Sequence, residues 1–182
     1  MLEQTRQDYV SRYGQAKWIK HRQSIEDVWL GIQKIIQSLN LPHASVRLYQ
    51  DGLPICGKEE DIVKDVAAQG SKNHKLLLEL MSSGCRLMGT EDPALLLQEY
   101  QLHQGARSEA APEQKSQREE RSRALIQARD KFIAGRINAT LLAGEIGLLF
   151  LGLAHAVETL LDADILVRQL LPSLREKQAK TL

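Results

Sequence analysis

The stretch GEIGLLFLGLAH, residues 144–155, is a nearly unbroken apolar run that ends in Gly152 and a single histidine, His155. Apolar runs of this length that are bounded by glycine are typical of a strand buried on both faces, as in a parallel sheet covered by helices. Ligands of open α/β sheets bind in the crevice beyond the carboxyl ends of the strands. The run therefore predicts a buried strand, with His155 as a candidate site residue at its end.

Outward from this run, the chain alternates between predicted helices and predicted strands. The other strands are expected at 46–49, at the beginning of CRLMGTED (85–92) and at 164–170, DILVRQL. Helices are expected at about 24–39, 59–70, 71–83, 93–103, 122–143 and 156–161. Strands separated by helices form parallel sheets with right-handed crossovers. The sequence thus predicts a single α/β domain with a mainly parallel sheet of about four strands flanked by helices.

Two segments depart from this alternation. Residues 1–23 are polar, with scattered aromatic side chains, and predict a loosely attached arm or helix. Helical spacing of apolar residues begins at Ser24, which forms a capping-box pattern with Asp27, so the α/β domain is expected to span 24–182. Residues 104–122 lack apolar periodicity and predict a flexible insertion, either a solvated loop or the frayed start of the next helix.

Composition excludes several classes of partner. The net charge is +1 and aromatic residues make up 4% of the chain, which argues against nucleic acid as the main partner. The two cysteines, Cys56 and Cys85, lie far apart and fit a reduced compartment. The N-terminus lacks the apolar core of a signal peptide, and the longest apolar run is too short to span a bilayer. We expect a cytoplasmic protein with no membrane partner.

Polar side chains follow three of the predicted strands where each one ends. The first strand ends in Gln50-Asp51, the second in Thr90-Glu91 and the third in His155. Because parallel strands share one carboxyl edge, we expect Asp51, Glu91 and His155 to face a common crevice. Each has a simpler interpretation by itself, since Asp51 suits a turn and Glu91 suits the first turn of a helix.

The long helix predicted at 122–143 brings two more charged residues to the same edge. Arg129 and Asp130 lie on or beside its apolar face, where charges need partners. From Asp130 to Ala143 the helix covers roughly 20 Å at 1.5 Å per residue. The following strand returns roughly 25 Å to His155 at 3.3 Å per residue. Arg129 and Asp130 are therefore expected at about the level of His155.

The helix expected at 71–83 should also begin at this edge. Its first turn carries Ser71, Asn73 and His74. The backbone N–H groups at a helix N-terminus favour an anion, so Asn73 and His74 are candidate binding residues. For Ser71, ordinary helix capping is a sufficient explanation.

Residues 129–155, RDKFIAGRINATLLAGEIGLLFLGLAH, resemble the C-terminal part of the TraB/PrgY and TIKI group of the erythromycin-esterase-like and ChaN-like superfamily. Members of that group carry a helix with Arg-Asp followed by an Ile/Met-Ala pair, then a strand that ends in Gly-x-Ala/Gly-His. The matching residues are Arg129, Asp130, Ile133, Ala134, Gly152, Ala154 and His155. The resemblance implies an α/β fold, a relation to metal-dependent peptidases or esterases, and site roles for Arg129 and His155.

The leading hypothesis is a metal-dependent hydrolase with its site at the carboxyl edge of the sheet. Asp51, Glu91 and His155 are suited to bind a divalent metal ion, with Arg129 positioning a small anionic substrate. Without a metal, His155 would act as a general base oriented by Asp130, with Glu91 as a further catalytic candidate. The other candidate substrate-binding residues are Gln50, Thr90, Asn73 and His74.

A non-catalytic module is the alternative hypothesis. Such a module would hold a small ligand or regulate a partner without turning the ligand over, and the loops after the strands would serve for recognition. No nucleophile motif and no glycine-rich phosphate loop is present to decide between the two. A homo-oligomer is also compatible with the sequence.

Overall fold

The computed structural model describes residues 2–104 and 112–171, with side chains described for 6–104 and 115–171. The helices are α1 (Leu2–Tyr13), α2 (Gln15–Ser38), α3 (Glu59–Ala68), α4 (Lys72–Ser82), α5 (Pro93–Gln104) and α6 (Pro112–Thr140). The strands are β1 (Val46–Gln50), β2 (Arg86–Met88) and β3 (Ile146–Phe150). Two short 3₁₀ helices, η1 (His43–Ser45) and η3 (Val157–Leu160), complete the described elements.

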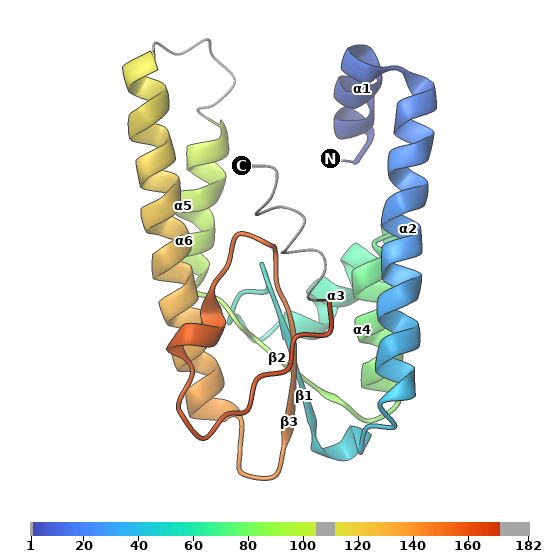
Figure 1. Ribbon diagram of the computed structural model, residues 1–182, viewed down its shortest axis with the longest axis vertical. Coiled ribbons are helices and arrows are strands. Elements are labelled where there is room, and N and C mark those ends of the chain that lie inside the picture. Colours follow the sequence, from blue (N-terminus) through green and yellow to red (C-terminus); the bar gives the residue numbers. More distant parts are fainter. Residues whose placement is uncertain (1, 105–111, 172–182) are drawn as a thin grey trace.

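The three strands are parallel and lie in the order β2-β1-β3. Leu48 of the central strand lies opposite Leu87 of β2 and Leu148 of β3. Helices α2, α3 and α4 cover one face of the sheet, whereas α6 and η3 cover the other (Figure 1). The predicted α/β class is confirmed, with three strands in the described residues rather than four.

Each face of the sheet has its own hydrophobic core because side chains alternate along the strands. The core under α2–α4 contains buried Ile36, Val46, Leu48, Leu53, Val63, Leu76, Leu77, Leu80, Cys85 and Leu148. The core under α6 contains buried Tyr49, Ile133, Ala134, Ile137 and Val157. The apolar stripe of α6 therefore faces the sheet, and it brings Arg129 and Asp130 to the carboxyl edge with it.

The apolar run at 144–155 supplies an edge strand and not, as predicted, a strand buried on both faces. Its strand, β3, is only partly buried, whereas β1 is buried along its whole length although it contains Arg47. Arg47 is tolerated there because its guanidinium forms a bidentate ion pair with Glu145. Apolar composition alone predicted the wrong strand for the centre of the sheet, because the ion pair with Glu145 lets a strand that contains Arg47 be buried there.

The fourth strand predicted at 164–170 is wrong, because this segment crosses between the two cores instead of joining the sheet. Ile165 packs against the core under α6, and Leu170 packs against the core under α2–α4. Leu166, between them, is 96% exposed. In Figure 1 the chain passes in front of β3 on this route. The alternating apolar residues of DILVRQL thus serve two separate cores, a pattern that resembles a strand in the sequence.

Of the two forms predicted for 1–23, arm or helix, the described residues from Leu2 onward are helical, since α1 and α2 run from Leu2 to Ser38 with one interruption at Gly14. The capping box predicted at Ser24 and Asp27 is wrong. Ser24 lies inside α2, where its hydroxyl donates to the Lys20 carbonyl at 3.0 Å. No helix in the described part of the chain is long and apolar enough to cross a membrane.

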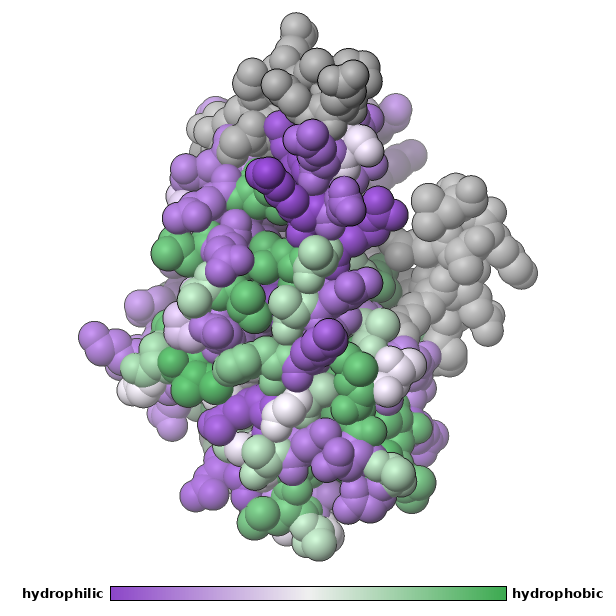
Figure 2. All heavy atoms as spheres, turned by 90° about the vertical axis from the view of Figure 1, so that its left-hand side faces the viewer, coloured by the Kyte–Doolittle hydropathy of each residue, from purple (hydrophilic) through white to green (hydrophobic). Residues whose placement is uncertain are grey.

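Helix α6 begins at Pro112, so the later part of the predicted 104–122 insertion is helical, while 105–111 lies outside the described residues. The N-terminal half of α6 pairs with α5 beyond the sheet. Hydrophilic side chains dominate the upper part of this side of the molecule, and hydrophobic ones are interspersed further down (Figure 2). The polar N-terminal half of α6 can form a helix here because packing against a single helix, α5, requires only a narrow apolar stripe.

Candidate functional site

Arg129 of α6 binds carboxylates from three separate segments at the carboxyl edge of the sheet. Its Nη2 lies 2.6 Å from Asp51 Oδ1, just after β1, and 2.5 Å from Glu91 Oε1, after β2. Its Nε donates to Glu91 Oε2 at 2.7 Å, and its Nη1 donates to Glu99 Oε1 of α5 at 2.7 Å. We call these four residues the Arg129 cluster. The cluster ties α5 and α6 to the ends of two strands.

The cluster is largely shielded from water. Arg129 is 3% exposed and Glu91 is fully buried, whereas the side chains of Asp51 and Glu99 are 25% and 31% exposed. The hydrogen bonds that Arg129 donates to Glu91 raise the pKa of Arg129 above its ordinary value, so the guanidinium stays charged. Asp51 and Glu99 are therefore the members of the cluster that can meet a ligand.

Thr90 and Glu91 hold the ends of β1 and β2 together. Thr90 Oγ1 accepts from the Gln50 backbone N–H at 3.0 Å and donates to the Met88 carbonyl at 3.0 Å. Glu91 Oε1 accepts from the Gly52 backbone N–H at 2.8 Å. Thr90, a predicted substrate-binding residue, is fully buried, and its hydroxyl holds the strand ends in position.

His155 and Asp130 form a buried pair beside the Arg129 cluster. His155 Nδ1 lies 2.5 Å from Asp130 Oδ1, and Asp130 Oδ2 accepts from the Ala156 backbone N–H at 2.9 Å. On the other side of the imidazole, His155 Nε2 lies 3.6 Å from Asp51 Oδ2. Asp51 Oδ2 also accepts from the Gly152 backbone N–H at 3.0 Å. The predicted level of Asp130 with respect to His155 is confirmed.

Asn73 and His74 lie at the start of α4, and Asn73 reaches the same edge through Gln50. Asn73 Nδ2 donates to Gln50 Oε1 at 2.7 Å, and Gln50 Nε2 donates to the Asp51 carbonyl at 2.8 Å. Ser71 caps α4, as predicted, and its hydroxyl lies 2.9 Å from His74 Nδ1. Burial lowers the pKa of His74, which favours its neutral form. Asn73 Oδ1 is buried and has no hydrogen-bond partner among the described residues.

The carboxylates at this edge outnumber the cations that bind them. Three carboxylates surround Arg129, and Asp130 adds a fourth beside His155. Arg136, two turns further along α6, donates to the Gly89 carbonyl. Even with His155 protonated, the formal charges of this set sum to a negative value. Such a field repels anions, so the expected anionic substrate has no electrostatic support from this edge.

The residues predicted to bind a metal, Asp51, Glu91 and His155, do come to the same edge. Both Glu91 oxygens, however, already accept hydrogen bonds from Arg129, which places a positive charge where a cation would sit. No group of three His, Cys, Asp or Glu residues within the described ranges has an arrangement suited to a metal ion. The donor set therefore fits an ion-pair cluster better than a metal centre.

Glu99 is the one member of the cluster that the sequence analysis did not identify. It lies within α5, a helix in which polar and apolar residues alternate without a clear period. A glutamate in such a helix carries no signal, because only the packing of α5 against α6 brings it to Arg129. By contrast, the positions of Asp51, Glu91 and His155 at strand ends could be predicted from parallel topology.

Comparisons of this chain with family models, with curated proteins and with solved structures found no match. The resemblance of residues 129–155 to the TraB/PrgY and TIKI group stays a prediction.

Proposed function

We propose that the protein is a hydrolase in which His155, oriented by Asp130, acts as a general base at the carboxyl edge of the sheet. The observation that supports this proposal is the buried Asp130–His155 pair, with its 2.5 Å contact to Nδ1. An ionised carboxylate can only accept, so Nδ1 carries the proton of that contact and Nε2 is the basic nitrogen. A carboxylate, an imidazole and a reacting group in this order are the usual parts of acid–base hydrolysis.

The proposed reaction uses only groups at this edge. His155 Nε2 accepts a proton from water as the water oxygen attacks the carbonyl carbon of an ester or amide. The tetrahedral intermediate then collapses, and the imidazolium returns the proton to the leaving oxygen or nitrogen. Asp130 stabilises the imidazolium between the two steps, while its second oxygen is held by the Ala156 N–H.

The charge of the site favours neutral or cationic substrates. Asp51 and Glu99 are the partly exposed carboxylates of the Arg129 cluster, and an approaching ligand meets them first. A positively charged group beside the scissile bond would be attracted, whereas a phosphate or carboxylate would be repelled. The preference should therefore run from cationic to neutral to anionic substrates.

Three chromogenic probes of different charge test the proposal: alanine p-nitroanilide, p-nitrophenyl acetate and p-nitrophenyl phosphate. We expect hydrolysis of the first two, with Asp130→Asn and His155→Gln each lowering kcat about 100-fold or more. His103→Gln, which changes an exposed histidine at the end of α5, is the matched control and should keep full activity. Wild-type rates at the buffer background, or unchanged rates in both site variants, would refute a hydrolase with this base.

A second measurement tests the metal-dependent mechanism. Titration of Mn²⁺ into the protein, followed by calorimetry and by the same assays, shows whether the ion binds stoichiometrically and raises the rate. We expect neither effect, because hydrogen bonds from Arg129 already occupy Asp51 Oδ1 and both Glu91 oxygens. Stoichiometric uptake that requires Glu91 would favour the metal-dependent mechanism instead.

A further inference from the structure

The two edges of the sheet differ in what lies beside them. At the β3 edge, residues 161–170 pass from one core to the other. At the β2 edge, no described strand pairs with the outer side of Arg86–Met88. Natural proteins usually cover or shorten an edge strand, because its unpaired backbone groups readily bind another strand. β2 is short, with three residues, but its outer side is not paired with any described strand.

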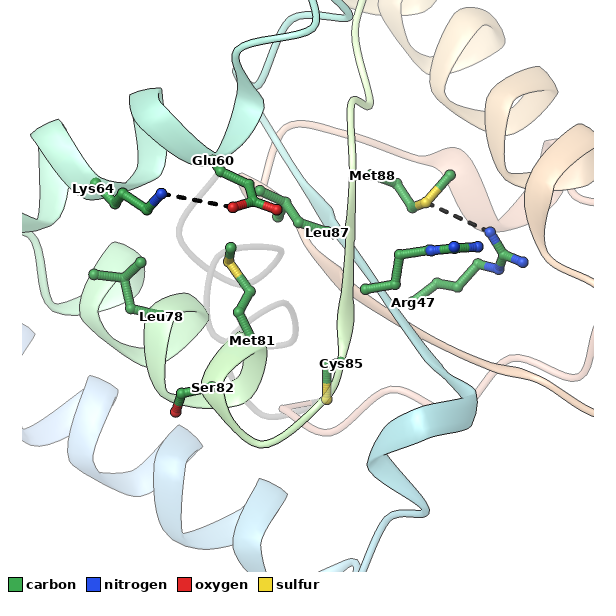
Figure 3. Close-up of a pocket in the computed structure, with 10 residues that line it drawn as sticks. Arg47, Glu60, Lys64, Leu78, Met81, Ser82, Cys85, Leu87 and Met88 are labelled. Atoms are coloured by element: carbon green, nitrogen blue, oxygen red, sulfur yellow. Dashed lines mark hydrogen bonds and ion pairs between the residues drawn. The ribbon is translucent and has the colours of Figure 1, made fainter.

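A groove of about 680 Å³ runs along this edge. Figure 3 shows β2 between two sets of side chains, with Lys64, Glu60, Leu78 and Met81 on the side of α3 and α4, and Arg47 and Met88 on the other. Leu87 faces the core under α2–α4, so the alternation of the strand places Arg86 on the opposite face with Met88. The groove is therefore lined by side chains from both faces of the sheet at its β2 edge.

The two sides of the groove differ in chemistry. The side towards α4 is lined by Leu78, Met81 and Leu87. Lys64 on that side pairs with Glu60 and with Asp61. The other side presents Arg86, which is exposed and whose charge helps to lower the pKa of Glu145. Arg47 lies beside it and is paired with Glu145. An added strand would therefore meet apolar side chains on one face and positive charge on the other.

We propose that the β2 edge binds an extended peptide segment of a partner protein, in which apolar and acidic residues alternate. The peptide backbone would pair with β2 and extend the sheet by one strand, as in other cases of β-strand addition. Its apolar side chains would pack on Met81 and Leu78, and its acidic side chains would face Arg86. The period of two along a strand makes this alternation the pattern that matches both sides of the groove. The inference stands independently of the proposed hydrolase.

Fluorescein-labelled peptides test the proposal by fluorescence anisotropy. The probe is the hexapeptide EVELEV, compared with a scrambled peptide of the same composition, EEEVLV, and with KVKLKV. We expect EVELEV to bind with an affinity at least about tenfold higher than either comparison peptide, since both the alternation and the charge are needed. Equal binding of the scrambled peptide, or no binding of EVELEV, would overturn the proposal.

Substitutions in the protein locate the binding surface. Arg86→Glu should weaken EVELEV binding at least about tenfold and improve KVKLKV binding, because attraction becomes repulsion. Arg168→Glu, a charge reversal at an exposed residue away from the groove, is the matched control and should leave both affinities unchanged. Circular dichroism melts confirm that each variant is folded. An unchanged EVELEV affinity in folded Arg86→Glu would refute binding at β2.

Backbone pairing is tested with N-methylated peptides. Alternate backbone N–H groups of a strand point to opposite edges, so methylation of residues 1, 3 and 5 or of residues 2, 4 and 6 blocks different edges. One of the two methylated forms of EVELEV should lose binding while the other keeps it. Equal effects of both would exclude strand addition. Self-association of the protein that disappears in Arg86→Glu would identify a second copy as the occupant and would also overturn the proposal.

Discussion

Replacing Arg129 by methionine should destabilise the protein strongly, because it leaves the buried Glu91 carboxylate without its counter-charge. Glu91 is fully buried and loses two hydrogen bonds, at 2.5 Å and 2.7 Å, and the remaining donor among the described residues is the Gly52 N–H. Hydrogen bonds to charged groups contribute about 1.5–3 kcal/mol each, and breaking a buried ion pair from one side costs about 3–5 kcal/mol. We expect the free energy of unfolding to fall by about 3–5 kcal/mol.

Asp51 and Glu99 should add little to that loss, since each is partly exposed and can be solvated by water. The double variant Arg129→Met, Glu91→Met removes both buried charges and should recover most of the lost stability. Arg123→Met, at an exposed position of the same helix, is the matched control and should change stability by less than about 0.5 kcal/mol.

Urea denaturation followed by circular dichroism measures all three variants, with the slope of the unfolding free energy checked for two-state behaviour. A loss below about 1 kcal/mol in Arg129→Met would refute the idea that Glu91 depends on this guanidinium. A double variant as unstable as Arg129→Met would show that Arg129 acts through its packing and not through its charge.

Three further predictions follow from single contacts. Gly89→Ala should lower the melting temperature, because its Cβ would lie 3.0 Å from the Cα of Ile55 and the backbone must shift; differential scanning calorimetry measures this. Thr90→Val should cost about 1–3 kcal/mol in urea denaturation, because the buried Gln50 N–H loses its acceptor; a loss below about 0.3 kcal/mol would contradict this role. Burial lowers the pKa of His74, so the folded state binds its proton less well than the unfolded state, and stability should fall as the pH drops below about 6.5; His74→Gln should flatten this dependence between pH 7 and 5.

The carboxyl edge of the sheet shows that one set of acidic residues in a sequence suits either an ion-pair cluster or a catalytic site. Acidic residues at the ends of adjacent parallel strands are expected both for a metal centre and for a frame that holds helices to a sheet. In this protein Arg129 occupies the space between the carboxylates, and the Asp130–His155 pair lies beside it. The proposed chemistry therefore depends on His155 and not on the carboxylates that bind Arg129.

Some features set by neighbouring residues in the chain were predicted correctly, whereas the capping box at Ser24 and Asp27 was wrong. Ser71 caps α4 and α5 begins at Pro93, both as expected, because helix starts depend on side chains within one helical turn. The α/β class followed from alternating apolar patterns. The level of Asp130 with respect to His155 followed as well, since helix rise and strand rise fix how far the chain returns after a crossover.

Features that depend on contacts between distant segments required the tertiary structure. The strand order places polar β1 in the centre and apolar β3 at the edge, and residues 164–170 serve two cores instead of forming a strand. The ion-pair partners of Arg129 likewise could not be predicted from the sequence, because a charge beside an apolar stripe needs a counter-charge but does not specify which residue supplies it. Local patterns fix what each segment can form, whereas the free energy of burial and ion pairing is decided only when all segments pack together.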